Sequence, residues 1–312
     1  MNIKILLIML VFLASYNLTA KTEINETHSL SDNGRIHVDN ISGSITLNGW
    51  DKNEVKIQGS YSGSVEKVDI TSSSNTIRIK VVYRLGLFFK GKCDLEIFAP
   101  RNGKLDIDSV SAKINISGFK SSASIDSVSG DIVLSGDFTS LDVDSTSGDV
   151  ELSGNAETLE INTTSGDVDI TGSGEEIDFS SISGSLKIIG TYPRIKGDTI
   201  SGSVDYKGKA IDYCNINTTS GSVNIDCIPN EKADLNIQTT SGTIDITVPS
   251  EISARLKFES FSGTIKVIGI DYENSYEEDF MEISKTLKTT IGNGDVKIYL
   301  QTLSGSIKLK GK

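Results

Sequence analysis

Hydrophobic and polar residues alternate along most of this chain in a pattern that repeats every 18 to 21 residues. The pattern is plainest between residues 141 and 171, where LDVDSTSGDVELS is soon followed by LEINTTSGDVDIT. Each copy has an alternating run, a Ser/Thr-x-Ser-Gly segment and a second alternating run. Period-two alternation is typical of a strand with one buried face, so each copy predicts two half-buried strands joined by a turn.

The glycines of the Ser-Gly pairs mark the period. They are Gly130, Gly148, Gly166, Gly184, Gly202, Gly221, Gly242, Gly263 and Gly305. The step is 18 residues as far as Gly202, and then lengthens to 19 and 21. In copies aligned on these glycines, apolar residues occupy the positions seven and five before the Gly and two and four after it. One copy cannot bury its apolar face alone, so repeats of this size must stack.

These observations predict an all-β fold, a single-chain parallel β-solenoid with coils of about 18–21 residues and two main sheet faces. Right-handed coiling is the default for parallel crossovers. Residues 105–270 hold the regular repeats. Residues 21–104 hold a first coil and longer strands that cap one end, and residues 271–312 hold an acidic insertion and a final capping coil. We expect caps because a bare coil end exposes a row of unpaired backbone groups.

A Ser or Thr stands three residues before each repeat glycine, and a Ser stands immediately before it. Ser and Thr hydroxyls bond nearby backbone groups, and Gly accepts positive φ angles without a Cβ clash, so this segment predicts a turn. A catalytic Ser is the alternative for any one such segment. Its repetition in every coil excludes that alternative.

The first 20 residues have the features of a secretory signal peptide. Lys4 precedes an apolar run from Ile5 to Ala14, and a small residue, Ala20, stands at the expected cleavage point. The run is about half of the roughly 20 residues that a membrane span needs. No later segment is long and apolar enough to span. We therefore expect an exported protein that does not cross a membrane, in the periplasm or at the cell surface.

Composition narrows the range of partners. The formal charge of −12 becomes −13 when Lys4 leaves with the signal peptide, so nucleic acid is a poor partner. The two histidines, His28 and His37, lie near the mature N-terminus. His37 alternates with apolar neighbours, which predicts an outward strand residue without a ligand or catalytic role.

Stacked aspartates raise the question of a metal. Two columns are expected, namely Asp108, Asp126 and Asp144, and Asp131, Asp149 and Asp167. Like charges one strand apart repel by roughly 1 kcal/mol in water, and a cation could relieve that repulsion. The Gly-rich nonapeptide of calcium-binding coils is absent, so solvated carboxylates are the preferred interpretation. We predict no catalytic, cofactor-binding or metal-binding residues.

Two other functions stay open as alternatives. A carbohydrate-active β-helix enzyme, a lyase or hydrolase, needs carboxylates that converge in a cleft, whereas these coils are uniform and almost free of loops. Ice binding needs an unbroken outward threonine ladder, and the column of Thr146, Thr164, Thr219 and Thr240 is interrupted by isoleucines. The favoured hypothesis is a non-enzymatic envelope protein that binds or spaces an unknown envelope protein or polysaccharide.

The three cysteines, Cys93, Cys214 and Cys227, are an odd count for an exported chain. Cys214 and Cys227 fall in one coil, at the same expected edge, so a disulfide between them is one alternative. The other is that each packs as a small hydrophobe. Cys93 alternates with apolar residues, which predicts a buried, unpaired thiol.

Three motifs resemble a known family. They are Gly-x-Ile-x-Val-x-x-Ile-Ser-Gly-Ser-Ile-x-Leu-x-Gly-Trp (Gly34 to Trp50), Leu-x-Ile-x-Ala-Pro (Leu95 to Pro100) and the serial Ser-Gly-Asp-Val coils. Together they resemble the DUF4097 family of candidate adhesins across nearly all of the mature chain. The resemblance implies the repeat architecture, but no reaction, cofactor or ligand, and it supplies no functional residues to carry over.

Overall fold

The computed structural model describes residues 21–84, 91–272, 276–277 and 284–312. Within these ranges the chain forms strands and turns and no helix, so the predicted all-β class is confirmed. In the same ranges no helix is long and apolar enough to cross a membrane. The predicted signal peptide, residues 1–20, lies outside the described residues.

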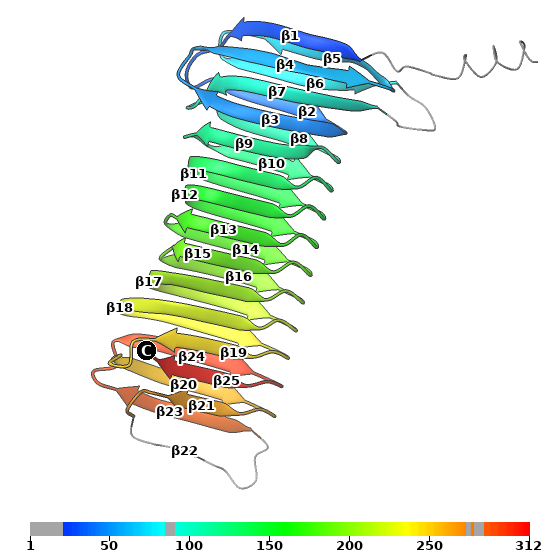
Figure 1. The fold of residues 1–312 in the computed structure, drawn as a ribbon. Coiled ribbons are helices and arrows are strands. Elements are labelled where there is room, and N and C mark those ends of the chain that lie inside the picture. The colour runs from blue at the N-terminus through cyan, green and yellow to red at the C-terminus, as the bar shows by residue number, and fades with distance from the viewer. Residues whose placement is uncertain (1–20, 85–90, 273–275, 278–283) are drawn as a thin grey trace, which may run out of the picture.

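The strands stack level upon level into a rod with two faces (Figure 1). The first face carries the strands that precede each Ser-Gly turn, β8 (Lys104–Ser109), β10 (Ala123–Ser127), β14 (Glu176–Ser181), β16 (Arg194–Thr199) and β20 (Ala254–Ser260). The second face carries the strands that follow it, β9 (Lys113–Phe119), β13 (Val168–Ser173), β15 (Leu186–Thr191), β19 (Ile244–Val248) and β21 (Ile265–Ile268). Longer strands run from the second face round the far edge onto the first face, namely β11 (Ile132–Ser145), β12 (Val150–Thr163), β17 (Val204–Thr218) and β18 (Val223–Thr239).

Neighbouring levels pair in parallel along both faces. On the first face Ala123 lies beside Leu141, and on the second face Ile132 lies beside Val150, so equivalent residues stack 18 positions apart. The apolar columns expected to point inward are buried, as for Leu141 at 1% exposure. Val267 is only partly buried, because among the described strands β21 pairs on one side only, with β25.

The turn between the faces is capped by the hydroxyl three residues before the glycine. Ser145 Oγ accepts a hydrogen bond from the Gly148 amide at 3.2 Å, and Thr163 Oγ1 accepts one from the Gly166 amide at 3.0 Å. The predicted turn chemistry of Ser and Thr is therefore present. The explanation offered for the glycine is wrong, because these glycines do not have positive φ angles. A Cβ on Gly166 would lie 2.0 Å from the carbonyl oxygen of Gly148, so close stacking of the levels demands Gly there.

The N-terminal section adds β1 (Thr22–Ser29), β2 (Arg35–Asn40), β3 (Gly43–Trp50), β4 (Glu54–Ser62), β5 (Val65–Ser72), β6 (Thr76–Tyr83) and β7 (Lys92–Pro100). The first coil, β2 and β3, lies between the level formed by β6 and β7 and the level formed by β8 and β9. Antiparallel strands cover this end, because β5 pairs with β6 and β4 lies between β7 and β1.

The C-terminal section adds β22 (Tyr276–Glu277), β23 (Lys285–Ile291), β24 (Val296–Thr302) and β25 (Ile307–Gly311). The final coil does not cap the rod, so its predicted place is wrong. Strand β24 lies between β18 and β20, and β25 lies between β19 and β21 (Figure 1). The chain reaches this position because β23 runs antiparallel to β20 along the outer side of that strand. It then turns at Gly292 and Gly294, whose φ angles are 59° and 70°, so that β24 pairs with the inner side of β20.

The alternative of a Cys214–Cys227 disulfide is not realised. Cys93, Cys214 and Cys227 are all buried free thiols, as predicted for Cys93. Burial raises the pKa of Cys227 to about 12, and it raises the pKa of Cys214 further. A thiol held in its protonated form does not attack other thiols or disulfides, so each of these cysteines acts as a small apolar side chain.

Candidate functional site: a groove along the turn edge

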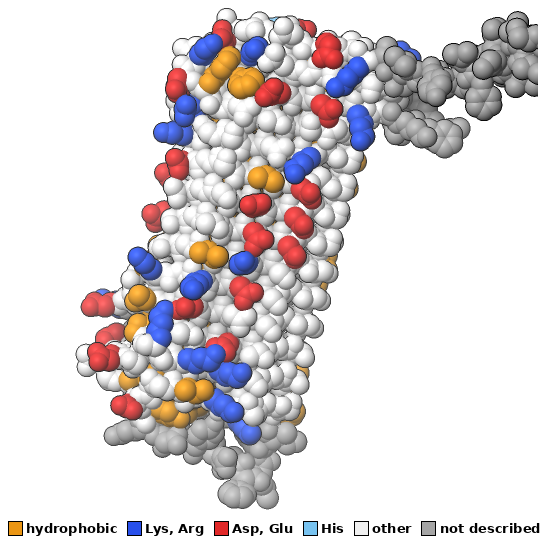
Figure 2. Space-filling view, viewed as in Figure 1, with side chains coloured by type: hydrophobic (Ala, Val, Ile, Leu, Met, Phe, Trp, Pro, Cys, Tyr) orange, Lys and Arg blue, Asp and Glu red, His pale blue; other side chains and the backbone are white. Residues whose placement is uncertain are grey.

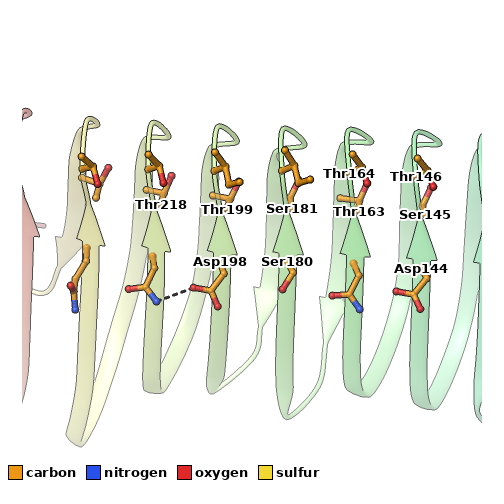
Figure 3. A pocket seen from close by; sticks show the side chains of 18 of the residues that line it. Asp144, Ser145, Thr146, Thr163, Thr164, Ser180, Ser181, Asp198, Thr199 and Thr218 are labelled. Carbon is orange, nitrogen blue, oxygen red and sulfur yellow. Dashed lines mark hydrogen bonds between the residues drawn. The ribbon is translucent and has the colours of Figure 1, made fainter.

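A groove of about 1380 Å³ follows the turn edge of the first face along the rod. Three columns of side chains line it, and each level contributes one residue to each column. Figure 3 shows the repetition, with Asp144, Ser145 and Thr146 from one level and Asp198 and Thr199 from another. The groove was not predicted from the sequence.

The polar column consists of the residues four before each repeat glycine. In order along the rod it reads Asp39, Asp108, Asp126, Asp144, Asn162, Ser180, Asp198, Asn217, Gln238, Gln301 and Glu259. The floor column consists of the next residues, whose hydroxyls cap the turns and face inward. The floor of the groove is therefore made mostly of hydroxyls that are already hydrogen-bonded. The polar column forms one wall, and several of its side chains have partners of their own, such as Asp198, which accepts a hydrogen bond from Asn217 at 2.9 Å.

The lip column consists of the residues two before each repeat glycine. In order along the rod it reads Ile41, Val110, Val128, Thr146, Thr164, Ile182, Ile200, Thr219, Thr240, Leu303 and Phe261. Six of the large apolar side chains that are exposed in the described residues belong to this column, with exposures from 44% to 52%. Scattered exposed apolar residues are ordinary, but six in one column along a groove make this edge the candidate binding surface.

The turns that carry the lip column are held firmly to one another. The Thr146 amide donates to the Ser127 carbonyl at 3.1 Å, and the Ser147 amide donates to the Val128 carbonyl at 2.9 Å. The same pair of bonds recurs at successive levels. The lip is thus preorganised, which lowers the entropy cost of binding.

The groove is acidic toward the N-terminal end of the rod. The pKa of Asp126 is raised, chiefly by partial desolvation and then by the charges of Asp108 and Asp144 on the adjacent levels. Asp142, two residues before Asp144 on β11, also has a raised pKa, from desolvation and then from the charges of Asp144 and Glu160. Among the described residues that line the groove, none is Lys, Arg or His.

His37 lies close to this acidic end. Its Nδ1 is 3.1 Å from Asp106 and its Nε2 is 3.5 Å from Asp108. His37 lies on the outer side of β2, as predicted, but these neighbours leave it only 9% exposed. Within the described chain, these three residues form the one group whose ligand atoms could surround a metal. The guanidinium of Arg78 lies 3.0 Å from His37 Nε2 and already supplies a positive charge there. The arrangement fits a charge cluster better than a metal centre.

The second aspartate column has a structural role. Asp149 Oδ1 accepts a hydrogen bond from the Asp167 amide at 2.9 Å, and Asp167 Oδ1 accepts one from the Ser185 amide at 2.8 Å. The Ser-Gly-Asp motif therefore ties one level to the next, and this bonding accounts for its repetition.

Figure 2 views the second face and shows acidic side chains gathered midway along the rod, with basic ones nearer its C-terminal end.

The comparisons with known proteins identify the class of the molecule. The profile of the family described as Toastrack DUF4097 matches residues 13–197 and 155–310. The chain belongs to this family, as its motifs suggested. No curated protein matches it.

Several solved structures resemble this chain at low sequence identity. A candidate adhesin from Parabacteroides merdae is 13% identical, with a TM-score of 0.45, over 73% of this chain and 92% of that one. A proposed lipid-binding protein from Parabacteroides distasonis is 14% identical, with a TM-score of 0.48, over 92% of this chain and 96% of that one. A candidate adhesin from Bacteroides fragilis is 12% identical, with a TM-score of 0.37, over 93% and 98%. At these values no ligand or partner is transferred to the present chain.

Proposed function

We propose that this protein is an exported, non-enzymatic binding rod that holds an extended polymer along the turn-edge groove. The observation that carries the proposal is the continuity of the groove, which the lip and polar columns line at level after level. A groove of this form offers the same contacts at each step of about 4.8 Å, which suits a long ligand better than a small molecule.

The test uses site-directed crosslinking on mature protein. The native cysteines are buried, so a Thr164→Cys variant can be labelled selectively with a photoreactive maleimide. Thr171→Cys, on the second face, is the matched control. Exposed to solubilised cell-envelope material, the groove label should capture polymer and the control label should not. Equal capture from both positions would reject the groove as the binding site.

Export is part of the same proposal and has its own test. The apolar run after Lys4 and the small residue Ala20 support cleavage by a signal peptidase. Amino-terminal sequencing of protein recovered from its native compartment should begin at or near Lys21. Recovery of a chain that still begins at Met1 would contradict export by this route.

A carbohydrate-active enzyme is the second candidate, favoured by one observation. Asp126 has a raised pKa and lies between Asp108 and Asp144 in the groove, which is the environment of a general acid beside a carboxylate. The side chains of Asp126 and Asp144 are exposed, however, so among the described residues nothing shields them from water. We expect no cleavage of neutral or acidic polysaccharides in a reducing-end assay. Turnover that Asp126→Asn abolishes would establish the enzyme instead.

A further inference from the structure

We infer that the ligand of the groove is an uncharged polysaccharide, laid along the rod with its less polar surfaces against the lip column. This inference rests on the proposed function and adds the chemical class of the ligand. Nothing in the preceding comparisons assigns such a ligand.

The charge of the groove excludes polyanions. Six lining residues are acidic, namely Asp39, Asp108, Asp126, Asp144, Asp198 and Glu259, and no described lining residue is cationic. Lys80 and Lys257, outside the lining, pair with Asp39 and Glu259, whereas Asp126, Asp144 and Asp198 have no cationic partner among the described residues. Phosphate headgroups and uronic acid chains would meet repulsion from Asp126, Asp144 and Asp198, which no basic side chain relieves. A polycation would suit the acidic end but not the amide-rich remainder, where Asn217, Gln238 and Gln301 stand. An uncharged chain meets no penalty at either end.

The polar column offers the hydrogen bonds that sugar hydroxyls need. Carboxylates accept from hydroxyl groups, and the amides of Asn162 and Gln238 can both donate and accept. Within the described part of the chain, the side chains of Asn162 and Ser180 have no protein partner, so their hydrogen-bonding capacity faces the groove. At other levels the polar side chain already has one partner, as Asn217 has Asp198 and Gln301 has Tyr299, and keeps its remaining donors or acceptors. A polar side chain thus stands at every level, which matches a ligand with hydroxyls on every unit.

Beyond Ile41, which precedes Val110 along the rod, the lip column alternates in pairs of apolar and threonine side chains. Along the rod it reads Val110 and Val128, Thr146 and Thr164, Ile182 and Ile200, Thr219 and Thr240, then Leu303 and Phe261. An apolar pair therefore recurs every four levels, a distance on the order of 19 Å. Pyranose rings combine C–H surfaces with hydroxyl edges and can contact apolar and hydroxyl side chains in turn.

Two other extended ligands fit less well. An acyl chain would lie against a wall of carboxylates and amides and would cross a threonine pair between each pair of apolar contacts. A peptide that adds a strand needs unpaired backbone groups, whereas the amides of the turns are already bonded from level to level. The observations therefore favour the polysaccharide.

The test is calorimetric titration of the mature protein with defined probes. Cellohexaose and mannohexaose are the neutral probes, hexagalacturonate is the anionic probe, and vesicles of phosphatidylethanolamine and phosphatidylglycerol are the lipid probe. The lip variant is Ile182→Ser with Ile200→Ser. Its control is Ile189→Ser with Ile228→Ser, which removes isoleucines of similar exposure outside the groove. Both variants should melt close to the wild type, because they change exposed side chains.

We expect a neutral hexasaccharide to bind more tightly than its trisaccharide, and the lip variant to weaken binding about tenfold while the control leaves it unchanged. Failure of both neutral probes to bind would overturn the inference. Binding of hexagalacturonate or vesicles, weakened by the lip variant alone, would overturn the ligand class and leave the binding groove in place. Neutral binding that the lip variant does not weaken would overturn the groove itself.

Discussion

At the scale of single residues, the stacking of one level on the next fixes the glycine and aspartate of each repeat. Gly148 and Gly166 pack against the backbone of the preceding level, where a Cβ has no room. Asp149 and Asp167 bond the amide of the following level. The repeated Ser-Gly-Asp motif thus serves to stack the levels. The ligand-binding candidates are instead the lip and polar columns, two and four residues before each repeat glycine.

Alanine substitutions should separate stacking glycines from replaceable ones. Gly166→Ala forces a methyl group against the Gly148 carbonyl, so we expect it to lower the free energy of unfolding by roughly 1–3 kcal/mol. Gly197→Ala is the matched control, because its Cβ would lie 3.7 Å from Ile216 at ordinary contact distance. Relief of glycine entropy should make it neutral or stabilising by about 0.4–1 kcal/mol. Urea denaturation measures both, and equal effects would refute the stacking explanation.

The stacked carboxylates of Asp108, Asp126 and Asp144 predict that replacing Asp126 by a neutral residue stabilises the fold. The raised pKa of Asp126 means that the folded state holds its proton more tightly than the unfolded chain does. Stability from this group is therefore highest at low pH and declines as pH rises through the folded pKa. Asp126→Asn should raise the melting temperature at pH 7 and low salt, with the gain fading below about pH 4.

Glu176 provides the opposite case for the same melting experiment. Its pKa is lowered, chiefly by the hydrogen bond from Lys196 at 2.6 Å, so its stabilisation is present at pH 7 and is lost as pH falls. Glu176→Gln should lower the free energy of unfolding by roughly 0.2–1 kcal/mol at pH 7, as expected for an exposed ion pair.

If millimolar Ca²⁺ stabilised the wild type but not Asp126→Asn, the stacked carboxylates of Asp108, Asp126 and Asp144 would be a cation site after all.

The free cysteines predict the outcome of a thiol count. Denatured, unreduced protein taken from its native compartment should titrate with three free thiols, because Cys93, Cys214 and Cys227 are unpaired in the fold. A count of one would show that Cys214 and Cys227 become bridged during export.

At the scale of elements, the first and the last coil of the chain each lie one level inside the rod. Strand β24 pairs with β18 on one side and β20 on the other, and β2 pairs with β8 and β6 in the same way. Lys310 and Lys312 add ion pairs from the last coil to Asp245 and Asp226. A terminal repeat held on both sides cannot fray from the rod as an outermost repeat does.

A cavity in the inserted coil should loosen two neighbours at once. Leu300 lies between Ile237 of β18 and Phe258 of β20, so Leu300→Ala should cost about 2–5 kcal/mol and reduce amide protection in both strands. Leu256→Ala is the control, because it lies on β20 between β24 and β23 and does not contact β18. Hydrogen exchange read by mass spectrometry distinguishes them. Loss of β18 protection in the Leu256 variant, without loss in β24, would indicate stacking in chain order.

At the scale of the whole molecule, stacked levels about 4.8 Å apart make a rod on the order of 60 Å long. Its ends are covered by antiparallel strands, β4 with β1 at one end and β23 at the other. Small-angle scattering of residues 21–312 should show an elongated monomer, and circular dichroism should show β-structure with almost no helix. A compact sphere or a helical spectrum would contradict this architecture.

The sequence by itself determined the class of fold, the repeat and the inward columns, because alternation and period follow directly from strand geometry and stacking. It also predicted the turn and its hydroxyl caps, which depend on contacts three residues apart. Tertiary structure alone decided which level lies beside which. The coils at 254–268 and 296–311 have the same repeat pattern, so by sequence either could stack on β18. It also decided the groove, because the apolar lip residues, 18 or more positions apart in the chain, become one surface only when the levels stack.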